Sequence, residues 1–410
     1  MIAAYSPPSE LRGLPPSFRH WQKRCYENGI PPVIAVAGTR GKSTVVRLLQ
    51  AIFNHAGVQS AIWTDFGVEI NGRRQTREIA GWNRALARLT ERSLDVAVQE
   101  LDWNLVSAVG LPHATYPIAA ITNVCNNVPR CVETPEGLVA RRALPRVAQA
   151  IHPSGSVCIN GEDYALDQVA MLSAGTPVVT ARSDSAPLLR QHRASGGTDL
   201  WIDDDGTIVG GVDGAKLEIL NVRDVALCLG GAASFEHTNV LLACAAALTT
   251  GIGTELIREA LVSFEPSVDH LPGSFSVRQV GSIDTFVDRI MPSWFLKPVL
   301  RAANPQSRRR QVTVIGGLDS IPTDDVFEVG RLLGRTHGAV IHHGEVDAER
   351  YDAFKRGIAR NDYPPVLLHM PTERRAINRA LRALRADDVA LFLCVDDPGP
   401  ALRAVARMRP

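Results

Sequence analysis

The sequence predicts an α/β protein with two domains, of which the first has a doubly wound parallel sheet and the second is a smaller α/β unit. Three observations predict this arrangement. A continuous apolar run at residues 33–37 leads through a glycine loop into a helical segment at 44–50. Further apolar strands alternate with helices as far as about residue 160. A second alternating series begins after residue 265.

A lead segment is predicted at residues 1–29, where prolines flank an amphipathic stretch at 18–28 that we expect to be helical. The first domain then spans 30–267. A linker with two prolines and a Leu-Pro-Gly turn ends it at 265–273, so the second domain spans 268–410.

The run VIAVAGTRGKSTVVRLLQ at residues 33–50 joins a buried strand, a glycine loop and a helix. Gly38 and Gly41 allow a tight turn whose N–H groups point inward, and Lys42 supplies a cation. The hydroxyl of Ser43 or Thr44 can reach a magnesium ion. A chance glycine turn is the alternative, but motif, strand and helix agree on a phosphate-binding loop. The sequence therefore predicts a site for a nucleoside triphosphate and Mg²⁺, built from Gly38, Thr39, Arg40, Gly41, Lys42, Ser43 and Thr44.

The remaining elements follow from the same alternation of apolar and amphipathic stretches. In the first domain we expect strands at 95–99, 118–124 and 157–159, with helices at 82–92 and 137–150. In the second domain we expect strands at 312–315, 339–342, 366–369 and 390–395, with helices at 325–336, 348–360, 373–384 and 400–408.

Glu100 lies at the carboxyl end of the strand predicted at 95–99. Ligands of open α/β sheets gather at those strand ends, so this carboxylate can face the phosphates and share their metal with Ser43. A helix-capping or surface carboxylate is the alternative. The phosphate loop upstream favours the metal role.

Bulk properties favour an enzyme of the cytoplasm. Lys and Arg total 44 against 43 acidic residues, which gives no argument for a nucleic-acid partner. No apolar stretch is long enough to span a membrane, and the N-terminus lacks the features of a signal peptide. The seven cysteines, without metal-type pairing, are interpreted as reduced thiols. The arginines at 308–310 are interpreted as a solvated linker.

The loop GTRGKST resembles that of the Mur-type ATP-dependent amide ligases, a superfamily that includes the peptidoglycan ligases and folylpolyglutamate synthase. The chain looks most similar to the ligase subunit of poly-γ-glutamate (capsule) synthase. It begins without an amino-terminal sugar-binding domain, and residues 140–143 lack the carbamylated-lysine motif. The resemblance implies a Rossmann-like C-terminal domain, ATP with Mg²⁺, and a small-molecule amino acid or peptide substrate. It also allows for a membrane-bound synthase partner.

The resemblance assigns roles to single residues. Glu100 matches the magnesium-binding glutamate, and Asn123 matches the asparagine that ends the next strand. Asn127 and Val128 replace the Asp-His pair that helps to hold a second metal, and neither side chain can do that work. An amide of this loop, on Asn126 or Asn127, is either a group that orients water or substrate or simply part of a polar loop.

Three further candidates come from the resemblance. Asn239, which opens a small-residue helix at 236–252, matches the asparagine presented to adenine, although close helix packing explains the same pattern. Asp288 matches a catalytic aspartate of the C-terminal domain, with Asp284 as a competing candidate. Asn160 and Asp163 match a turn that orders the nucleotide region, or they form an ordinary Asx turn.

The implied reaction is amide-bond formation through an acyl phosphate, with Lys42, Glu100 and Asp288 as its catalytic residues. The arginines of NGRRQTRE, which are Arg73, Arg74 and Arg77, can hold acceptor carboxylates or form a solvated loop. A degenerate ATP-binding scaffold or regulator is the competing class. A generic P-loop phosphotransferase or ATPase fits the glycine spacing and the separate C-terminal unit less well.

Overall fold

The computed structural model describes residues 14–212, 215–305, 309–395 and 397–409. Internal contacts divide the chain into two units. The first comprises residues 1–221 and 238–263, and the second comprises residues 222–237 and 264–410. Residues 222–237 therefore belong to the second unit, although residues 238–263, which follow them in the chain, belong to the first. Part of the predicted lead segment, residues 1–13, and one of the three clustered arginines, Arg308, lie outside the described residues.

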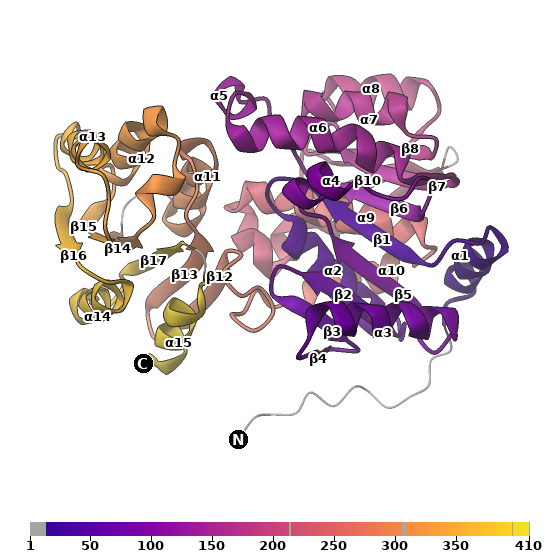
Figure 1. Ribbon diagram of the computed structural model, residues 1–410, viewed down its shortest axis with the longest axis horizontal. Helices are drawn as coiled ribbons and strands as arrows, with labels where there is room; N and C mark the ends of the chain where they lie inside the picture. Colours follow the sequence, from indigo (N-terminus) through magenta and orange to yellow (C-terminus); the bar gives the residue numbers. More distant parts are fainter. Residues whose placement is uncertain (1–13, 213–214, 306–308, 396, 410) are drawn as a thin grey trace. The chain divides into compact units, whose positions relative to one another are not determined.

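The first unit is built on one large sheet (Figure 1). Its strands are β1 (Val33–Ala37), β2 (Ser60–Thr64), β3 (Gly67–Ile70), β4 (Arg73–Arg74), β5 (Val96–Glu100), β6 (Tyr116–Ile121), β7 (Ile151–Asn160), β8 (Thr176–Ala181), β9 (Thr198–Ile202), β10 (Thr207–Val212) and β11 (Ala215–Asn221). Their order in the sheet is β11-β10-β9-β8-β7-β6-β1-β5-β2-β3-β4. The strands from β2 to β9 in this order are parallel, and antiparallel strands form both edges.

Helices surround this sheet (Figure 1). They are α1 (Pro16–Glu27), α2 (Lys42–His55), α3 (Glu78–Thr90), α4 (Trp103–Val109), α5 (Pro129–Val132), α6 (Pro135–Gln149), α7 (Asp167–Leu172), α8 (Pro187–Ala194), α9 (Ser234–Thr249) and α10 (Thr254–Val262). Helices α4, α6 and α7 pack in a row, and α2 packs against α10. β1 and β6 are buried at every position because helices cover the parallel strands on both faces.

The second unit has a six-stranded sheet among the described residues. Its strands are β12 (Ser276–Val280), β13 (Ile283–Arg289), β14 (Arg310–Ile315), β15 (His337–His343), β16 (Val366–Met370) and β17 (Val389–Cys394), in the order β12-β13-β17-β14-β15-β16. All neighbours are parallel except β12 and β13. The helices are α11 (Ser293–Ala303), α12 (Val326–Leu333), α13 (Ala348–Ala359), α14 (Glu373–Ala383) and α15 (Gly399–Arg407).

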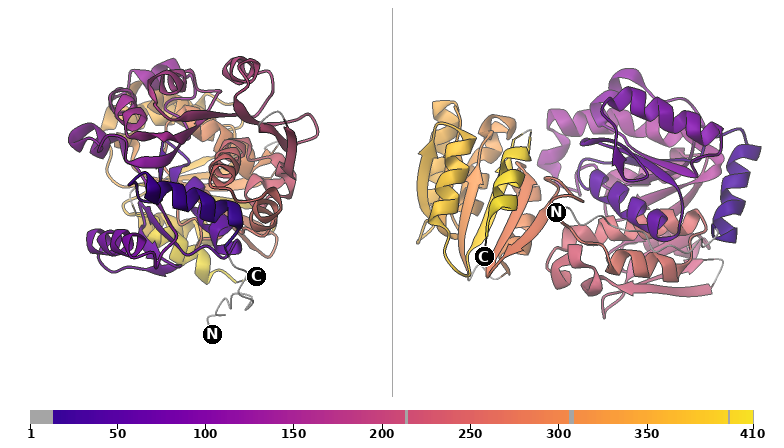
Figure 2. Two further views of the ribbon diagram at one scale, coloured as in Figure 1. Left: turned by 90° about the vertical axis from the view of Figure 1, so that its right-hand side faces the viewer. Right: turned by 90° about the horizontal axis from the view of Figure 1, so that it is seen from below.

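Two hydrophobic cores lie on the two faces of this second sheet, beneath its helices (Figure 2). Along β17, Val389, Leu391 and Leu393 belong to the core beneath α11, α12 and α13. The alternate residues, Ala390 and Phe392 among them, belong to the core beneath α14 and α15. This alternation is the two-residue period of a strand that is buried on both faces.

The predicted α/β class with a doubly wound parallel sheet is confirmed. β1 has the predicted bounds, and β5 and β6 lie within two or three residues of theirs. The expectation of a solvated arginine linker is wrong for Arg309 and Arg310. Arg309, which precedes β14, forms an ion pair with Asp284 of β13, and Arg310 of β14 forms one with Asp388, which directly precedes β17. No helix of the described residues is long and apolar enough to cross a bilayer.

His342 gives the second unit a specific sensitivity to acid. Its side chain is fully buried in β15, against the rings of Tyr351 and His369. Burial, with the neighbouring His369 and His343, lowers the pKa of His342 to about 4. The unfolded chain takes up this proton near pH 6.5, whereas the folded chain resists it until about pH 4. We therefore expect the free energy of unfolding to fall between those values by at most about 3 kcal/mol.

Urea unfolding at a series of pH values checks this expectation. His342→Leu removes the titrating group, so its midpoint should fall less steeply below pH 6.5 than that of the wild type. His337→Asn changes an exposed histidine of the same strand and should keep the wild-type slope. Equal slopes for the wild type and His342→Leu would contradict the assignment.

Candidate functional site

The glycine loop lies at the carboxyl end of β1, directly before α2. Gly38 has φ +145°, and a Cβ atom there would lie 1.9 Å from the hydroxyl of Thr122. Gly41 has φ +86°, and a Cβ atom there would lie 2.1 Å from the amide oxygen of Asn239. Both positions therefore require glycine, for conformation as well as for space. The loop leads without a side-chain cap into the first turn of α2, where backbone N–H groups favour an anion.

Residues 122–124, directly after β6, hold the glycine loop in place. Thr39 donates its N–H to the carbonyl of Asn123 at 2.9 Å and its hydroxyl to the carbonyl of Val124 at 2.6 Å. The carbonyl of Arg40 accepts hydrogen bonds from Thr122 Oγ1 at 2.6 Å and Asn123 Nδ2 at 3.0 Å. Asn123, expected from the resemblance, thus supports the phosphate loop through its backbone and its side chain.

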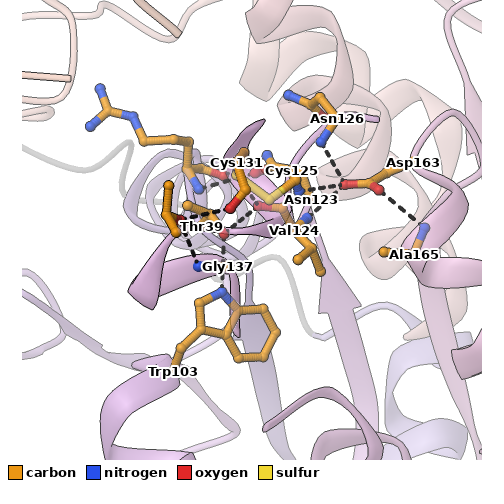
Figure 3. The surroundings of a disulfide bond; sticks show 12 residues. Thr39, Trp103, Asn123, Val124, Cys125, Asn126, Cys131, Gly137, Asp163 and Ala165 are labelled. Carbon is orange, nitrogen blue, oxygen red and sulfur yellow. Dashed lines mark hydrogen bonds between the residues drawn. A yellow bond between two sulfur atoms is a disulfide. The ribbon is translucent and has the colours of Figure 1, made fainter. Parts of the chain in front are cut away.

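Trp103, in the first turn of α4, also supports the loop, and the sequence analysis missed it. Its Nε1–H donates to the Thr39 hydroxyl at 3.2 Å (Figure 3). Trp103→Phe keeps most of the ring and removes the donor, at a cost of about 1 kcal/mol. We expect about fivefold weaker ATP binding by calorimetry. Trp201→Phe is the control: Trp201 lies on β9, four strands from β1 in the sheet, with the Arg193 guanidinium over its ring, and the variant should bind ATP as the wild type does.

Lys42, Ser43 and Glu100 meet beside the loop. β1 and β5 are neighbours, and Val36 is paired with Glu100 across them. The Glu100 carboxylate accepts a hydrogen bond from Ser43 Oγ at 2.8 Å and lies 3.5 Å from Lys42 Nζ. Thr44, the next residue of α2, is buried. The structure therefore brings together the three residues that were predicted to carry the charge of the site.

A second carboxylate, Asp65, lies next to this group and was missed by the sequence analysis. Its backbone N–H donates to Glu100 Oε2 at 3.3 Å. Burial raises the pKa of the Glu100 carboxyl, the charge of Asp65 raises it further, and Lys42 and Ser43 act against the rise. No group of three His, Cys, Asp or Glu side chains suited to a metal occurs among the described residues. The oxygen donors that meet here are the Glu100 carboxylate and the Ser43 hydroxyl.

The carboxylate of Asp163 holds the loop after β6 (Figure 3). Asp163 Oδ2 accepts hydrogen bonds from the N–H groups of Val124, Cys125 and Asn126, at 2.7, 3.0 and 2.9 Å. The side chain of Asn127 bonds the backbone of the turn that contains Asp163. Asn127 therefore closes a polar loop, which was one of the two interpretations left open.

Asn160 forms an ordinary Asx turn, which was the alternative to a role in ordering the nucleotide region. Its side-chain oxygen accepts the N–H of Glu162 at 3.1 Å, as in an Asx turn. Asp163 combines such a turn, through the N–H of Ala165, with its contacts to the loop after β6. Of Asn160 and Asp163, it is Asp163 whose side chain bonds Val124, a residue that supports the glycine loop.

Cys125 and Cys131 form a disulfide in this loop, so the expectation that all seven cysteines are reduced thiols is wrong for this pair. Their Cα atoms lie 5.6 Å apart because α5 returns the chain to the end of β6 (Figure 3). Spacing alone could not show this return. The free cysteines are buried, and burial raises the pKa of the Cys25 and Cys158 thiols to about 12.

Alkylation without reductant tests the disulfide. After denaturation in iodoacetamide, mass spectrometry should find Cys125 and Cys131 unmodified, whereas the buried free cysteines, such as Cys158, should be modified. A double Cys125→Ala, Cys131→Ala variant should lose about 2 kcal/mol of stability, the value expected for so short a loop. Full alkylation of the pair would contradict the bond.

Asn239 lies at the phosphate loop, with its amide over the α-carbon of Gly41. It is 5 % exposed and belongs to α9. The small residues that follow it, such as Ala243, are buried, in keeping with close packing of this helix onto the sheet. Its assignment to adenine stays a prediction.

Of the candidates in the second unit, Asp288 lies near the carboxyl end of β13, whereas Asp284 lies near its start. Asp288 is 4 % exposed, and its carboxylate accepts the N–H of Arg289 at 2.8 Å. Asp284 is committed to its ion pair with Arg309. Arg278 donates to the carbonyl of Val405 at 2.7 Å and so joins β12 to α15. Asp288 is thus the better placed of the two aspartates, and its catalytic role stays a prediction.

Comparisons of sequence identify a known domain in this region. Residues 36–127 match the family model of the Mur ligase middle domain. Cyanophycin synthetase from Synechocystis sp. is 23 % identical over 380 residues, which cover 87 % of this chain and 42 % of that protein. UDP-N-acetylmuramoylalanine–D-glutamate ligase from Synechococcus sp. is 28 % identical over 241 residues, which cover 58 % and 45 % of the two chains. This chain spans less than half the length of these curated relatives.

Solved structures share the fold. FolC from E. coli, in complex with DHPP and ADP, aligns with a TM-score of 0.63 at 16 % identity and covers 98 % of this chain and 95 % of that one. The bifunctional folylpolyglutamate synthase/dihydrofolate synthase from Yersinia pestis, complexed with AMPPNP and Mn ion, aligns with the same score at 15 % identity, with the same coverage. The chain thus shares the fold of these ligases and contains, at residues 36–127, a segment that matches the Mur ligase middle domain.

Proposed function

We propose that this chain is an ATP-dependent ligase that joins a carboxylate to an amine through an acyl phosphate. One observation carries the proposal: Lys42, Ser43 and Glu100 meet at a glycine loop on a Mur ligase fold. Relatives named as ligases, including cyanophycin synthetase, support the reaction class. Asp288 is proposed as a further catalytic residue from the second unit, where its carboxylate is held at the end of β13.

The chemistry needs two displacements. A carboxylate oxygen of the substrate attacks the γ-phosphorus of ATP, and ADP leaves. The amine nitrogen then attacks the acyl carbon, phosphate leaves, and the amine loses a proton to solvent. The loop N–H groups and Lys42 stabilise the negative charge on the transferring phosphoryl oxygens. Hydrogen bonds of Thr39 and Arg40 to the residues after β6 hold the loop, and with it these donors, in place before the substrate arrives.

The donor set at this loop fits Mg²⁺. The Ser43 hydroxyl and the Glu100 carboxylate are hard oxygen donors 2.8 Å apart, and Mg²⁺ is usually bound by one or two carboxylates together with substrate phosphates. When bound, the ion offsets charge on the phosphoryl oxygens. Lys42 neutralises Glu100 when no ion is present. Asn239, packed on Gly41, is proposed to contact the nucleotide.

Amino acids or peptides are the proposed substrates. The names cyanophycin synthetase and folylpolyglutamate synthase both describe ligases of amino-acid chains. Poly-γ-glutamate of a capsule, made with a membrane-bound synthase partner, is the specific polymer we propose, and the cytoplasm is the proposed location. Arg73 and Arg74, exposed on β4, are proposed to hold acceptor carboxylates together with Arg77.

A second function, an ATP-binding scaffold without turnover, is favoured by one observation. The position of the lost Asp-His pair is filled by Asn127, whose side chain is committed to the turn at 162–164. A scaffold of this kind keeps the phosphate loop and lacks the second metal.

Phosphate release distinguishes the two functions. The chain is incubated with ATP, Mg²⁺ and pairs drawn from acidic amino acids and short γ- or β-linked peptides, and each compound is also tested alone. A ligase releases phosphate only with a carboxylate and an amine together, and mass spectrometry finds a product equal to their sum less one water. Tight ATP binding without release for any pair supports the scaffold. Absence of ATP binding contradicts both.

A further inference from the structure

Strand β16 forms an edge of the second sheet (Figure 1). It pairs with β15, and no strand of the described residues lies on its other side. Its sequence, VLLHM, contains no Lys, Arg, Asp or Glu, the charged residues with which proteins commonly protect an edge from further pairing. Val366 is 61 % exposed, and Tyr363, shortly before the strand, is 82 % exposed. The edge therefore offers a further strand both a backbone to pair with and apolar side chains to cover.

The backbone groups that face away from β15 belong to Leu367 and His369. Gly344 donates its N–H to the carbonyl of Met370 at 3.2 Å, so the backbone of Met370 faces β15. Successive residues of a strand direct their backbone groups to opposite sides, which turns those of Leu367 and His369 outward. A strand that adds to this edge therefore forms its hydrogen bonds with these two residues.

Two prolines limit the ways in which a second copy of the chain can pair with this edge. Pro365 and Pro371 occupy the next outward positions before and after the strand, and proline has no N–H to donate. In an antiparallel arrangement centred on Leu368, Leu367 of each copy pairs with His369 of the other, and every outward N–H of the strand finds a carbonyl. A centre at Leu367 or at His369 instead places the other of these residues opposite a proline, where a hydrogen bond is lost. The backbone therefore favours the centre at Leu368.

Charges beyond the ends of the strand favour the same arrangement. Asp362 lies before the strand, and Arg374 lies after it in the first turn of α14, and both are exposed. An antiparallel copy brings the amino end of one strand to the carboxyl end of the other. With the centre at Leu368, Asp362 and Arg374 are equally far from it, so each aspartate meets the arginine of the other copy. A parallel copy places like charges together.

The apolar side chains also match in this register. Opposite residues of antiparallel strands point to the same face of a sheet. Leu368 therefore faces its own counterpart, and Val366 faces Met370 of the other copy. Leu368 and Met370 already pack at the margin of the core beneath α14 and α15. Pairing covers the exposed Val366 and joins the margins of the two cores.

We propose that β16 is the interface of a homodimer, in which two copies pair antiparallel about a two-fold axis at Leu368. The interface is isologous, because each copy contributes the same strand, and the two second sheets continue into one. A strand of five residues buries a small area, so the association is reversible and depends on concentration. The dimer goes beyond the proposed ligase reaction, and its tests need neither ATP nor turnover.

Sedimentation equilibrium of the full chain measures the association. The mass should rise from 44.4 kDa towards twice that value as the concentration increases from ~1 to ~100 µM. Asp362→Arg places like charges at both ends of the interface and should weaken dimerisation about tenfold. Adding Arg374→Asp to this variant restores opposite charges and should recover the wild-type affinity. Asp204→Arg makes the same change at an exposed position in the turn after β9 and should dimerise as the wild type does.

A cysteine at the two-fold axis tests the register. Leu368→Cys places two thiols in a non-hydrogen-bonded pair, whose Cα atoms lie about 4.5 Å apart, within reach of a disulfide. Diamide takes up the two thiol hydrogens as the sulfur–sulfur bond forms, and a non-reducing gel should show a covalent dimer. Val366→Cys faces Met370 of the other copy and should not cross-link. The described free cysteines are buried, so the wild type should remain uncross-linked as well.

Three results overturn the inference. A mass of 44.4 kDa at every concentration excludes the dimer. A dimer that forms with wild-type affinity in Asp362→Arg and without a disulfide in Leu368→Cys uses another surface. Equal cross-linking of Val366→Cys and Leu368→Cys contradicts the register. Should the thermal midpoint show that Leu368→Cys is unfolded, the exposed pair Asp362 and Arg374 decides through the loss and recovery of dimerisation.

Discussion

Replacing Lys42 by alanine is expected to lower ATP turnover about 10³-fold, the scale seen when one charge-stabilising donor is removed from an active site. The ammonium group lies 3.5 Å from Glu100 at the head of α2, where it would face the transferring phosphoryl group. Substrate-dependent phosphate release measures the effect, and calorimetry measures the accompanying loss of ATP affinity.

The control for this variant is Lys23→Ala. Lys23 pairs with Glu27 on the exposed face of α1, so its removal should leave turnover unchanged. Lys42→Ala leaves Glu100 buried without its cation, and circular dichroism must therefore show that the variant is folded. A folded Lys42→Ala protein with wild-type turnover would refute the role of the loop.

Replacing Glu100 by glutamine is expected to separate function from stability. The amide keeps the size of the side chain and an acceptor for Ser43, but it removes the negative charge from a buried position. Burial already raises the pKa of this carboxyl, which means that the charged form is costly to hold in the folded chain. We expect unchanged or higher thermal stability, together with a 10²- to 10³-fold loss of turnover, on the scale of one transition-state interaction.

Thermal denaturation and phosphate release, performed on one preparation, check this expectation. Glu91→Gln, at an exposed position just after α3, serves as the matched control and should change neither quantity. A loss of both activity and stability in Glu100→Gln would indicate a structural carboxylate instead of a metal ligand.

The glycine loop between a strand and a helix was predictable because its signal is local, and its binding of phosphate stays a prediction. Gly38, Gly41 and Lys42 occur within five residues of each other, between a strand and a helix that each show their own periodicity. Glu100 was predictable because it ends an apolar strand. In both cases the residues that define the site are neighbours in sequence, and the general rule for parallel sheets supplies their position.

Asp65 was not predictable from the same reasoning. Its position beside Glu100 depends on β2 lying next to β5, and strand order is a long-range property that periodicity does not report. The short antiparallel strand β3, which follows the turn at Asp65, lacks a long apolar run. The sequence analysis missed Trp103 and found only part of the role of Asp163. Their hydrogen-bond partners lie 64 and up to 39 residues away in the sequence.

Long-range pairing also explains the wrong expectations. Arg309 and Arg310 looked like a solvated run, but Asp284 and Asp388 reach them across the second sheet. Cys125 and Cys131 showed no metal-type spacing, and only the short helix α5 brings their sulfur atoms together. Composition gives no information on which residues pair with each other, because the fold determines those pairings.

A crystal structure with a non-hydrolysable ATP analogue and Mg²⁺ tests the central claim most directly. The β- and γ-phosphates should contact backbone N–H groups of residues 38–44 and the Lys42 ammonium, with the ion bound to Ser43 and Glu100. A triphosphate bound elsewhere on the first unit, with Lys42 still paired to Glu100 and no anion at the loop, would contradict it.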